Sequence, residues 1–343
     1  MLRAIYSFDH CPRTQSPVQG GVLVSPQVGI GQGILLPQPA NVAVDQNGFI
    51  GGYRAAESFV TIDLTGVLPP NQTKVTVGFR MLTLMVYASL HSLIHFAPAS
   101  AGADTAGYLF GMGPTAPWSQ TLNAESYVEV TYDFAAGSAS VLVNGVPAVF
   151  GQGPALSAAT KAAFAAGTGA INFRLASSAT FRYAIRDIYV VDDVAGDGMV
   201  GPIGPQKMFP IILDAADGAG WTASGAATPL DVLNTALPGN PYTSSPADKT
   251  PLVTSLKTTA PLGSRVNAVS LSLSGTSVGD GPSTSKIELS QGGQTLTPKF
   301  VVVQRAITYA APIGIFPKAP DGATWDLAKI DATTLKLTPD TVA

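Results

Sequence analysis

Residues 275–279 have the G-x-S-x-G pattern in which hydrolases hold a nucleophilic serine on a tight turn from a strand to a helix. Strand-like stretches flank the pattern on both sides, so Ser277 is expected to lie in a loop. The histidines His10, His91 and His95 all precede Ser277, whereas an α/β-hydrolase needs its histidine after the serine. We therefore interpret residues 275–279 as a turn without catalytic chemistry.

His91 and His95 have the i,i+4 spacing of a zinc-binding pair on a helix, but residue 92 is a serine and not the general-base glutamate of that motif. The approaching stretch, residues 75–81, alternates with a period of two and predicts a strand. Residues four apart on a strand share a face but lie about 13 Å apart, too far to share a metal ion. Structural histidines are expected.

Paired carboxylates for glycoside cleavage would have to come from Glu57, Glu125, Glu129 and Glu288. On one strand, Glu125 and Glu129 are about 13 Å apart, beyond the separation of about 5 to 9.5 Å that glycosidases use. No catalytic set of residues remains, so we expect a protein that is not an enzyme and needs no cofactor.

The acidic residues Asp192, Asp193 and Asp197 follow a predicted strand, among glycines. Carboxylates on a loop can bind calcium, although this spacing matches no EF-hand loop. A solvated linker is the favoured interpretation, and a calcium site is kept as the alternative.

Tyr108 and Trp118 are aromatic residues that could stack on sugar rings, although aromatic side chains more commonly pack in a core or an interface.

The glycine-rich residues 28–33 are flanked by Pro26 and Pro37 and lack the Lys-Ser/Thr of a phosphate-binding loop. An ordered loop is expected there.

The chain has 343 residues, of which only 12% are charged, roughly half the usual share. Its net charge of −3 gives no attraction to nucleic acid or to anionic lipid. A surface so poor in charge is expected to be covered by partners. The single cysteine, Cys11, cannot form an internal disulfide, and the first ten residues lack the apolar run of a signal peptide.

The stretch between Arg80 and Asp104 contains no charged residue and is long enough to span a bilayer. It includes two histidines, several serines and a proline, and the residues that lead into it, 75–81, alternate with the period of a strand. We expect a buried sheet and no membrane span.

Strand patterns dominate the chain. In residues 127–134 the even-numbered positions are apolar, while Glu129, Thr131 and Asp133 form a side that we expect to be wet. Residues 140–150 continue as a second hairpin, with Asn144-Gly145 as its turn. Further strands are predicted at 170–175 and 181–191, and a short helix from Ser157 to Ala166.

The pattern changes near residue 194, where glycines and prolines become frequent, and strands return from 251 on. We predict an all-β protein with a β-sandwich at 1–195, an extended linking segment at 196–250 and a smaller β-domain at 251–343. Later elements are expected at 265–273, 285–289, 299–303 and 334–337, with a helical turn at 325–330.

The hairpin at 127–145, the closing stretch Arg186 to Asp193 and the opening stretch Ala4 to His10 resemble the concanavalin-A-like (laminin-G-like) jelly-roll sandwiches. Some laminin-G-like domains bind calcium at the rim of the sandwich. The order of this sandwich, a Gly-Asp linker, Trp221 and a second β region ending at Trp325 resembles structural proteins of tailed bacteriophages. The resemblance implies a virion component without catalysis.

We therefore expect an oligomeric tail, collar or fibre-associated protein of the virion, assembled in the cytoplasm of a bacterial host with other virion proteins. A capsid decoration protein and a module that binds host glycans are the alternatives. The expected contact residues are Pro210, Ile211, Ile212 and Trp221, because the segment that contains them needs burial.

Overall fold

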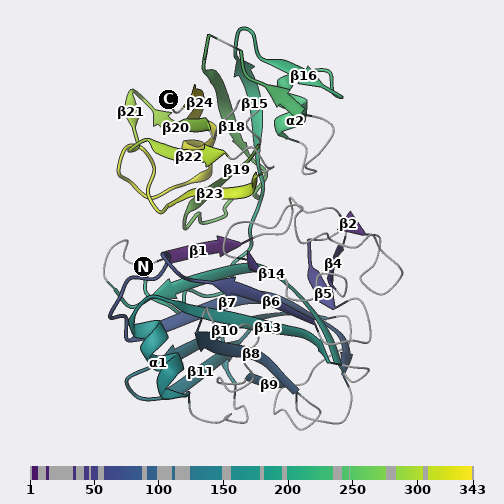
Figure 1. Ribbon diagram of the computed structural model, residues 1–343, viewed down its shortest axis with the longest axis vertical. Helices are drawn as coiled ribbons and strands as arrows, with labels where there is room; N and C mark the ends of the chain where they lie inside the picture. Colours follow the sequence, from purple (N-terminus) through teal and green to yellow (C-terminus); the bar gives the residue numbers. More distant parts are fainter. Residues whose placement is uncertain are drawn as a thin grey trace. The chain divides into compact units, whose positions relative to one another are not determined.

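The computed structural model describes residues 2–6, 13–14, 34–35, 42–45, 48–52, 58–86, 91–98, 110–112, 124–148, 156–177, 181–194, 199–234, 242–246, 248–275, 283–303 and 308–341. These residues form an all-β protein whose strands pair almost entirely antiparallel (Figure 1). The chain divides into two units, and the boundary between them falls between Lys207 and Met208.

One sheet of 14 strands makes up the first unit, within the described residues. The strands are β1 (Leu2–Tyr6), β2 (Arg13–Thr14), β3 (Ile34–Leu35), β4 (Val42–Asp45), β5 (Ile50–Gly52), β6 (Ser58–Asp63), β7 (Lys74–Val86), β8 (His91–Pro98), β9 (Phe110–Met112), β10 (Glu125–Asp133), β11 (Ser138–Val143), β12 (Val146–Pro147), β13 (Gly169–Ser177) and β14 (Phe181–Asp192).

This sheet folds into two layers. The first layer runs β12-β11-β10-β7-β14 and continues to β1 and β5, while the second contains β3, β6, β13, β8 and β9. The layers are joined where β13 turns into β14, and those two strands pair only at their adjoining ends, residues 176–177 with 181–182. Beyond that corner the two layers separate and face each other.

Aromatic side chains fill the space between the layers. Phe79 of β7 meets Phe173 of β13 edge-to-face at 5.1 Å between ring centroids, and Phe96 of β8 lies 5.6 Å from Tyr132 of β10. Phe164 covers one end of this core, 5.6 Å from Phe96. All five rings are fully buried, so the apolar positions predicted for residues 127–134 do face the core.

Helix α1 (Ala158–Ala165) supplies Phe164 and forms where the sequence predicts it. The side chain of Ser157 accepts a hydrogen bond from the backbone N–H of Thr160, which caps the first turn, and Gly167 follows the helix with a φ of +74°. The hairpin turn is also confirmed, because Asn144 and Gly145 both have the positive φ that a two-residue turn requires.

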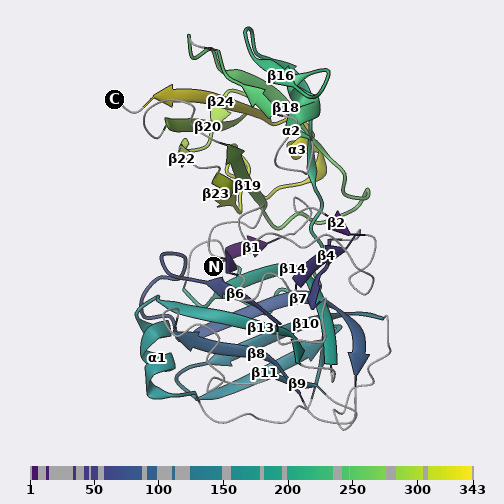
Figure 2. The same ribbon diagram turned by 45° about the vertical axis from the view of Figure 1, so that its right-hand side comes forward.

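The second unit is smaller. Its elements are β15 (Ile211–Asp217), β16 (Thr222–Ser224), α2 (Pro229–Leu233), β17 (Tyr242–Ser244), β18 (Leu252–Thr258), β19 (Val269–Gly275), β20 (Ser283–Gln291), β21 (Gln294–Thr295), β22 (Lys299–Val303), β23 (Thr308–Phe316), α3 (Leu327–Asp331) and β24 (Thr334–Thr341). A six-stranded sheet contains β15, β18, β24, β20, β21 and β22, and β19 pairs separately with β23 (Figure 2).

Buried side chains from both of these sheets form the core of the second unit, among them Leu256, Leu289, Phe316 and Trp325. The indole N–H of Trp325 donates to the carbonyl oxygen of Phe316 at 2.7 Å. The helical turn and the last strand predicted near the end of the chain are present as α3 and β24.

The segment expected to link two domains, residues 196–250, is divided between the units. Residues 199–207 belong to the first unit, and residues 211–217 form an edge strand of the second, paired with β18. The predicted strand at 265–273 begins only at Val269. Part of the expected linker is ordered by contacts with distant strands, and β19 begins at Val269 because its partner β23 ends at Phe316. Local composition reveals neither.

None of the helices in the described part of the chain is both long and apolar enough to cross a membrane. The uncharged stretch after Arg80 instead supplies strands β7 and β8.

Replacing Phe96 with alanine is expected to destabilise the first unit by about 3–5 kcal/mol, because a fully buried ring in contact with three others would leave a cavity. Chemical denaturation followed by near-ultraviolet circular dichroism measures the effect. Val146→Ala, at an exposed position of the same unit, is the control and should change stability by less than about 1 kcal/mol. Equal effects of the two substitutions would contradict the two-layer core.

Candidate functional site

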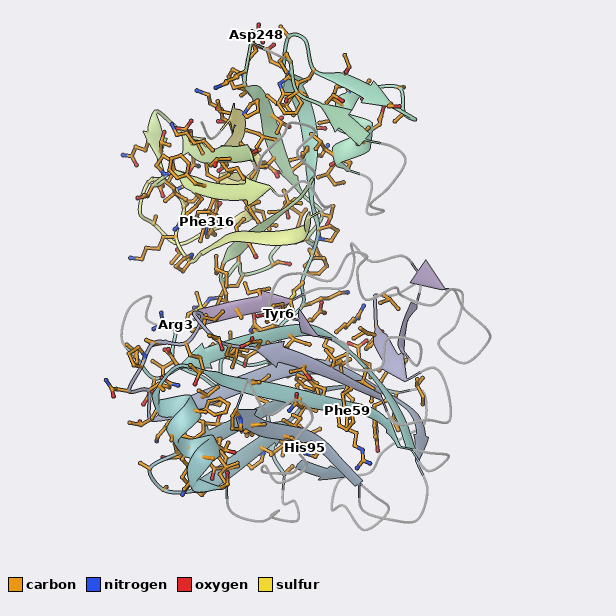
Figure 3. All side chains as sticks on the ribbon, viewed as in Figure 1. Arg3, Tyr6, Phe59, His95, Asp248 and Phe316 are labelled. Atoms are coloured by element: carbon orange, nitrogen blue, oxygen red, sulfur yellow. The ribbon has the colours of Figure 1, made fainter. Side chains whose placement is uncertain are left out.

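A structural role accounts for His95, the candidate histidine whose side chain the structure describes. His91 and His95 both lie on strand β8, as expected, and not on a helix. His95 is buried and its ring meets Phe59 edge-to-face at 6.3 Å between centroids (Figure 3). His10, Glu57 and Ser277 lie outside the described residues.

Protein groups bind the two calcium candidates that the structure describes. Asp192 is buried and forms an ion pair with Arg3 at 2.6 Å. Asp193 accepts hydrogen bonds from the backbone N–H of Thr73, at 3.0 Å, and from the Thr73 hydroxyl. Asp197 lies outside the described residues. Within the described part of the chain, no three His, Cys, Asp or Glu side chains gather closely enough to hold a metal ion.

The four contact candidates differ in their surroundings. Ile211 packs against the core of the second unit, and Trp221 packs against Leu252 and its neighbours while its indole N–H donates to the carbonyl oxygen of Thr250 at 2.8 Å. Pro210 and Ile212 face solvent, with Ile212 40% exposed. The glycan candidates Tyr108 and Trp118 lie outside the described residues.

The carboxylates excluded as a glycosidase pair form part of a polar cluster on the outer face of the first layer. This face, opposite the aromatic core, carries side chains from β7, β10 and β14. The expectation that Glu129 lies on a wet strand face is wrong, because this residue is only 1% exposed.

Glu129, Gly78 and Tyr189 stand in one row across β10, β7 and β14. The ring of Tyr189 lies over Gly78, where any Cβ atom would overlap it, and the Tyr189 hydroxyl donates to Oε1 of Glu129. The same oxygen accepts the backbone N–H of Gly204 at 2.9 Å. Burial raises the pKa of Tyr189 far above that of an ordinary phenol, and so its hydroxyl stays protonated and able to donate.

A second, charged group adjoins this row. Arg80 and Arg186 both pair with Glu125, the latter at 3.0 Å, and Arg80 also lies 3.4 Å from the carboxylate of Asp187. Asp187 has a φ of +51° and lies within a bulge where the register of β14 against β7 shifts. The bulge turns this carboxylate towards the arginines and the four charges neutralise one another.

The second unit presents a different kind of surface. Phe300 of β22 is 65% exposed and stands opposite Lys286 on the solvent face of the six-stranded sheet, where Lys286, Glu288 and Lys336 form ion pairs. Leu262 is 96% exposed at the tip of a turn that Ser264 closes by donating to the carbonyl oxygen of Pro261. Among the described residues of this unit, these two side chains and Ile212 are the exposed large apolar groups.

Sequence reasoning missed the outer-face cluster because its members are distant in the chain. Glu129 and Gly204 are separated by 75 positions, and nothing local marks them as partners. The one available signal was Gly78 in the middle of a strongly apolar strand, since a glycine there often marks the close approach of another group.

No family model and no curated protein matches the chain. Among solved structures it is similar to lectin II from Ulex europaeus, with 12% identity, 57% of this chain and 100% of that chain covered, and a TM-score of 0.32. The CBM22-1 xylan-binding domain of Paenibacillus barcinonensis Xyn10C is 11% identical, and the match covers 57% of this chain and 97% of that domain with a TM-score of 0.29. A sialidase is 10% identical over 47% of this chain, with a TM-score of 0.33, and the match covers only 17% of the sialidase chain.

Replacing Gly78 with alanine is expected to lower the free energy of unfolding of the first unit by about 1–3 kcal/mol, because the methyl group would displace the Tyr189 ring. Thermal or chemical unfolding measures the loss. The double variant Gly78→Ala/Tyr189→Ala tests the cause: if the two effects simply add, the close approach of this ring is not what requires a glycine.

Asp193 gives a pH-dependent prediction. Burial acts to raise the pKa of this carboxyl, but hydrogen bonds from Thr73 and the backbone N–H of Lys74 outweigh it and hold the pKa below its ordinary value. A depressed folded-state pKa adds stability above the unfolded-state value of about 4, and this stability is lost as pH falls through the folded-state pKa.

Asp193→Ala should therefore destabilise the protein by about 0.5–1.5 kcal/mol at pH 7, and the difference from the unmodified chain should shrink towards pH 2. Urea denaturation across this range measures it. A difference that stayed constant with pH would show that the charge of Asp193 is not involved.

Proposed function

We propose that the chain is a non-enzymatic structural protein of a tailed-bacteriophage virion, a tail, collar or fibre-associated component that acts by assembling with copies of itself and with other virion proteins. Its location would be the virion, after assembly in the cytoplasm of the bacterial host. The resemblance at residues 127–145 and 186–193 and the low share of charged residues support the proposal.

The exposed apolar side chains of the second unit are the observation that carries this proposal. Leu262 and Phe300 are 96% and 65% exposed in a chain with only 12% charged residues. Burial of such a side chain in an interface contributes about 1.5–3 kcal/mol. Two or three of them, together with the solvent face of the sheet, offer a contact that suits repeated assembly.

The polar groups of the first unit are consistent with this role. Glu125, Glu129, Asp192 and Asp193 are each held by arginines, hydroxyls or backbone N–H groups of the same unit. Their arrangement stabilises the sandwich. A catalytic acid or base would instead have to face a substrate.

Two alternatives are separated by direct measurements. A capsid decoration protein would be present in hundreds of copies in each particle, and a tail or collar component in about a dozen, so quantitative mass spectrometry of purified particles distinguishes them. A glycan-binding module would show saturable binding on a glycan array, lost in Trp118→Ala. Absence of the chain from particles made by the cells that express it would overturn the virion proposal.

Phe300→Asp is expected to weaken self-association at least tenfold, because it places a charge where an apolar ring would be buried. Sedimentation velocity over a concentration series measures the change. Gln294→Asp adds the same charge at an exposed position of the same sheet and should leave association unchanged. A chain that stays monomeric at the highest concentration, or a control variant that dissociates equally, would count against assembly through this surface.

A further inference from the structure

The solvent face of the six-stranded sheet in the second unit carries side chains that stand in rows across the strands (Figure 1). One row crosses β15, β18, β24 and β20 through Asp217, Val253, Lys336 and Glu288. The next row crosses β24, β20 and β22 through Thr338, Lys286 and Phe300. Because neighbouring residues of the same strands, such as Leu252 and Ile287, form the core, these rows face away from it.

Charge is divided across this face. Lys286 and Lys336 both pair with Glu288, at 2.9 and 3.8 Å, so that two positive charges share one negative charge on β24 and β20. Asp217 is exposed on β15, at the edge of the sheet, and Asp214 is exposed in the bulge of the same strand. The face therefore has an acidic side at β15 and a basic side at β24 and β20.

Two apolar side chains mark opposite corners of the face. Ile212 is 40% exposed on β15 and pairs with Lys257, two rows beyond Asp217. Phe300 is 65% exposed on β22, one row beyond Glu288 in the other direction. Four strand spacings and three rows separate these corners, about 19 Å across the strands and about 20 Å along them.

We propose that the solvent face of this sheet is self-complementary and stacks on the same face of a second copy of the chain, about a two-fold axis. The inference rests on the proposed self-association and names its surface and its partner. An axis that exchanges the two corners places Ile212 of each copy against Phe300 of the other. It also brings the acidic side of each copy towards the basic side of the other.

The dimensions of the face fit such a contact. Its diagonal has nearly equal components along and across the strands, so exchanging the corners turns the strands of the second copy by about 90°. Sheets that pack face to face commonly cross at close to a right angle. A two-fold contact makes each complementary pair twice. Opposite charges select this orientation, and burial of the apolar side chains supplies the free energy.

A mixing experiment with the full chain tests the proposal by sedimentation velocity. Lys286→Glu/Lys336→Glu makes both sides of the face acidic, and Asp214→Lys/Asp217→Lys makes both sides basic. Each variant alone should self-associate about tenfold more weakly or less, because like charges then meet in both halves of the contact. An equimolar mixture of the two variants should recover the association of the unmodified chain, because opposite charges meet again in both halves.

Lys318→Glu is the control, because it reverses a charge at an exposed position outside this sheet and should leave association unchanged. Near-ultraviolet circular dichroism checks that each variant is folded. If a charge-reversed variant does not fold, Lys286→Gln/Lys336→Gln takes the place of the acidic one and Asp214→Asn/Asp217→Asn that of the basic one, and each should still weaken association.

The outcomes separate this contact from the proposed function. An unmodified chain that stays monomeric at the highest concentration would overturn the proposed self-association and this contact together. An unmodified chain that associates, with variants that associate equally well, would overturn the contact alone. Folded charge-reversed variants that stay dissociated after mixing would do the same, because complementary charge would then not be what joins the two faces.

Discussion

A buried carboxylate constrains the first unit more than any other single group. Glu129 lies within a sheet and away from water, where an ionised group is costly unless hydrogen-bond donors surround it. The hydroxyl of Tyr189 can reach it only by passing over β7, which requires a glycine at position 78. The remaining donor, the N–H of Gly204, comes from a segment that has to cross the sheet. Both donors bind Oε1 of Glu129, while Oε2 is buried without a hydrogen-bond partner. The burial of this carboxyl group thus connects three features that are distant in the sequence.

Features with local determinants could be predicted from the sequence, and features that depend on distant residues, such as the burial of Glu129, could not. The turn at Asn144-Gly145 and the helix after Ser157 were predictable because their determinants lie within a few residues of each other. Period-two patterns likewise located β10, β13 and β14. Those patterns show which side chains share a face, but they do not show what covers that face. For this reason the pattern alone wrongly predicts that Glu129 faces solvent.

The segment between the two predicted domains shows a second limit of prediction from local sequence. Residues 196–250 are rich in glycine and proline, which is typical of a linker. Part of that stretch nevertheless pairs with β18, and another part is held by Arg80 and Glu129. Composition indicates how flexible a segment would be on its own, whereas contacts with residues far away in the sequence decide whether the segment is ordered.

The two units differ in how their polar side chains are arranged. In the first, polar and charged groups on the outer face bind one another and residues 204–206 of the same unit, which cover part of that face. In the second, ion pairs are left at the surface next to an exposed phenylalanine, and a leucine stands at the tip of a turn. Polar groups that already bind one another gain little from a partner, whereas exposed apolar groups gain free energy when they are covered. The exposed side chains of Phe300 and Leu262 therefore support the proposed contacts of the second unit with other molecules, and the first unit adds the exposed Val146 and Val200.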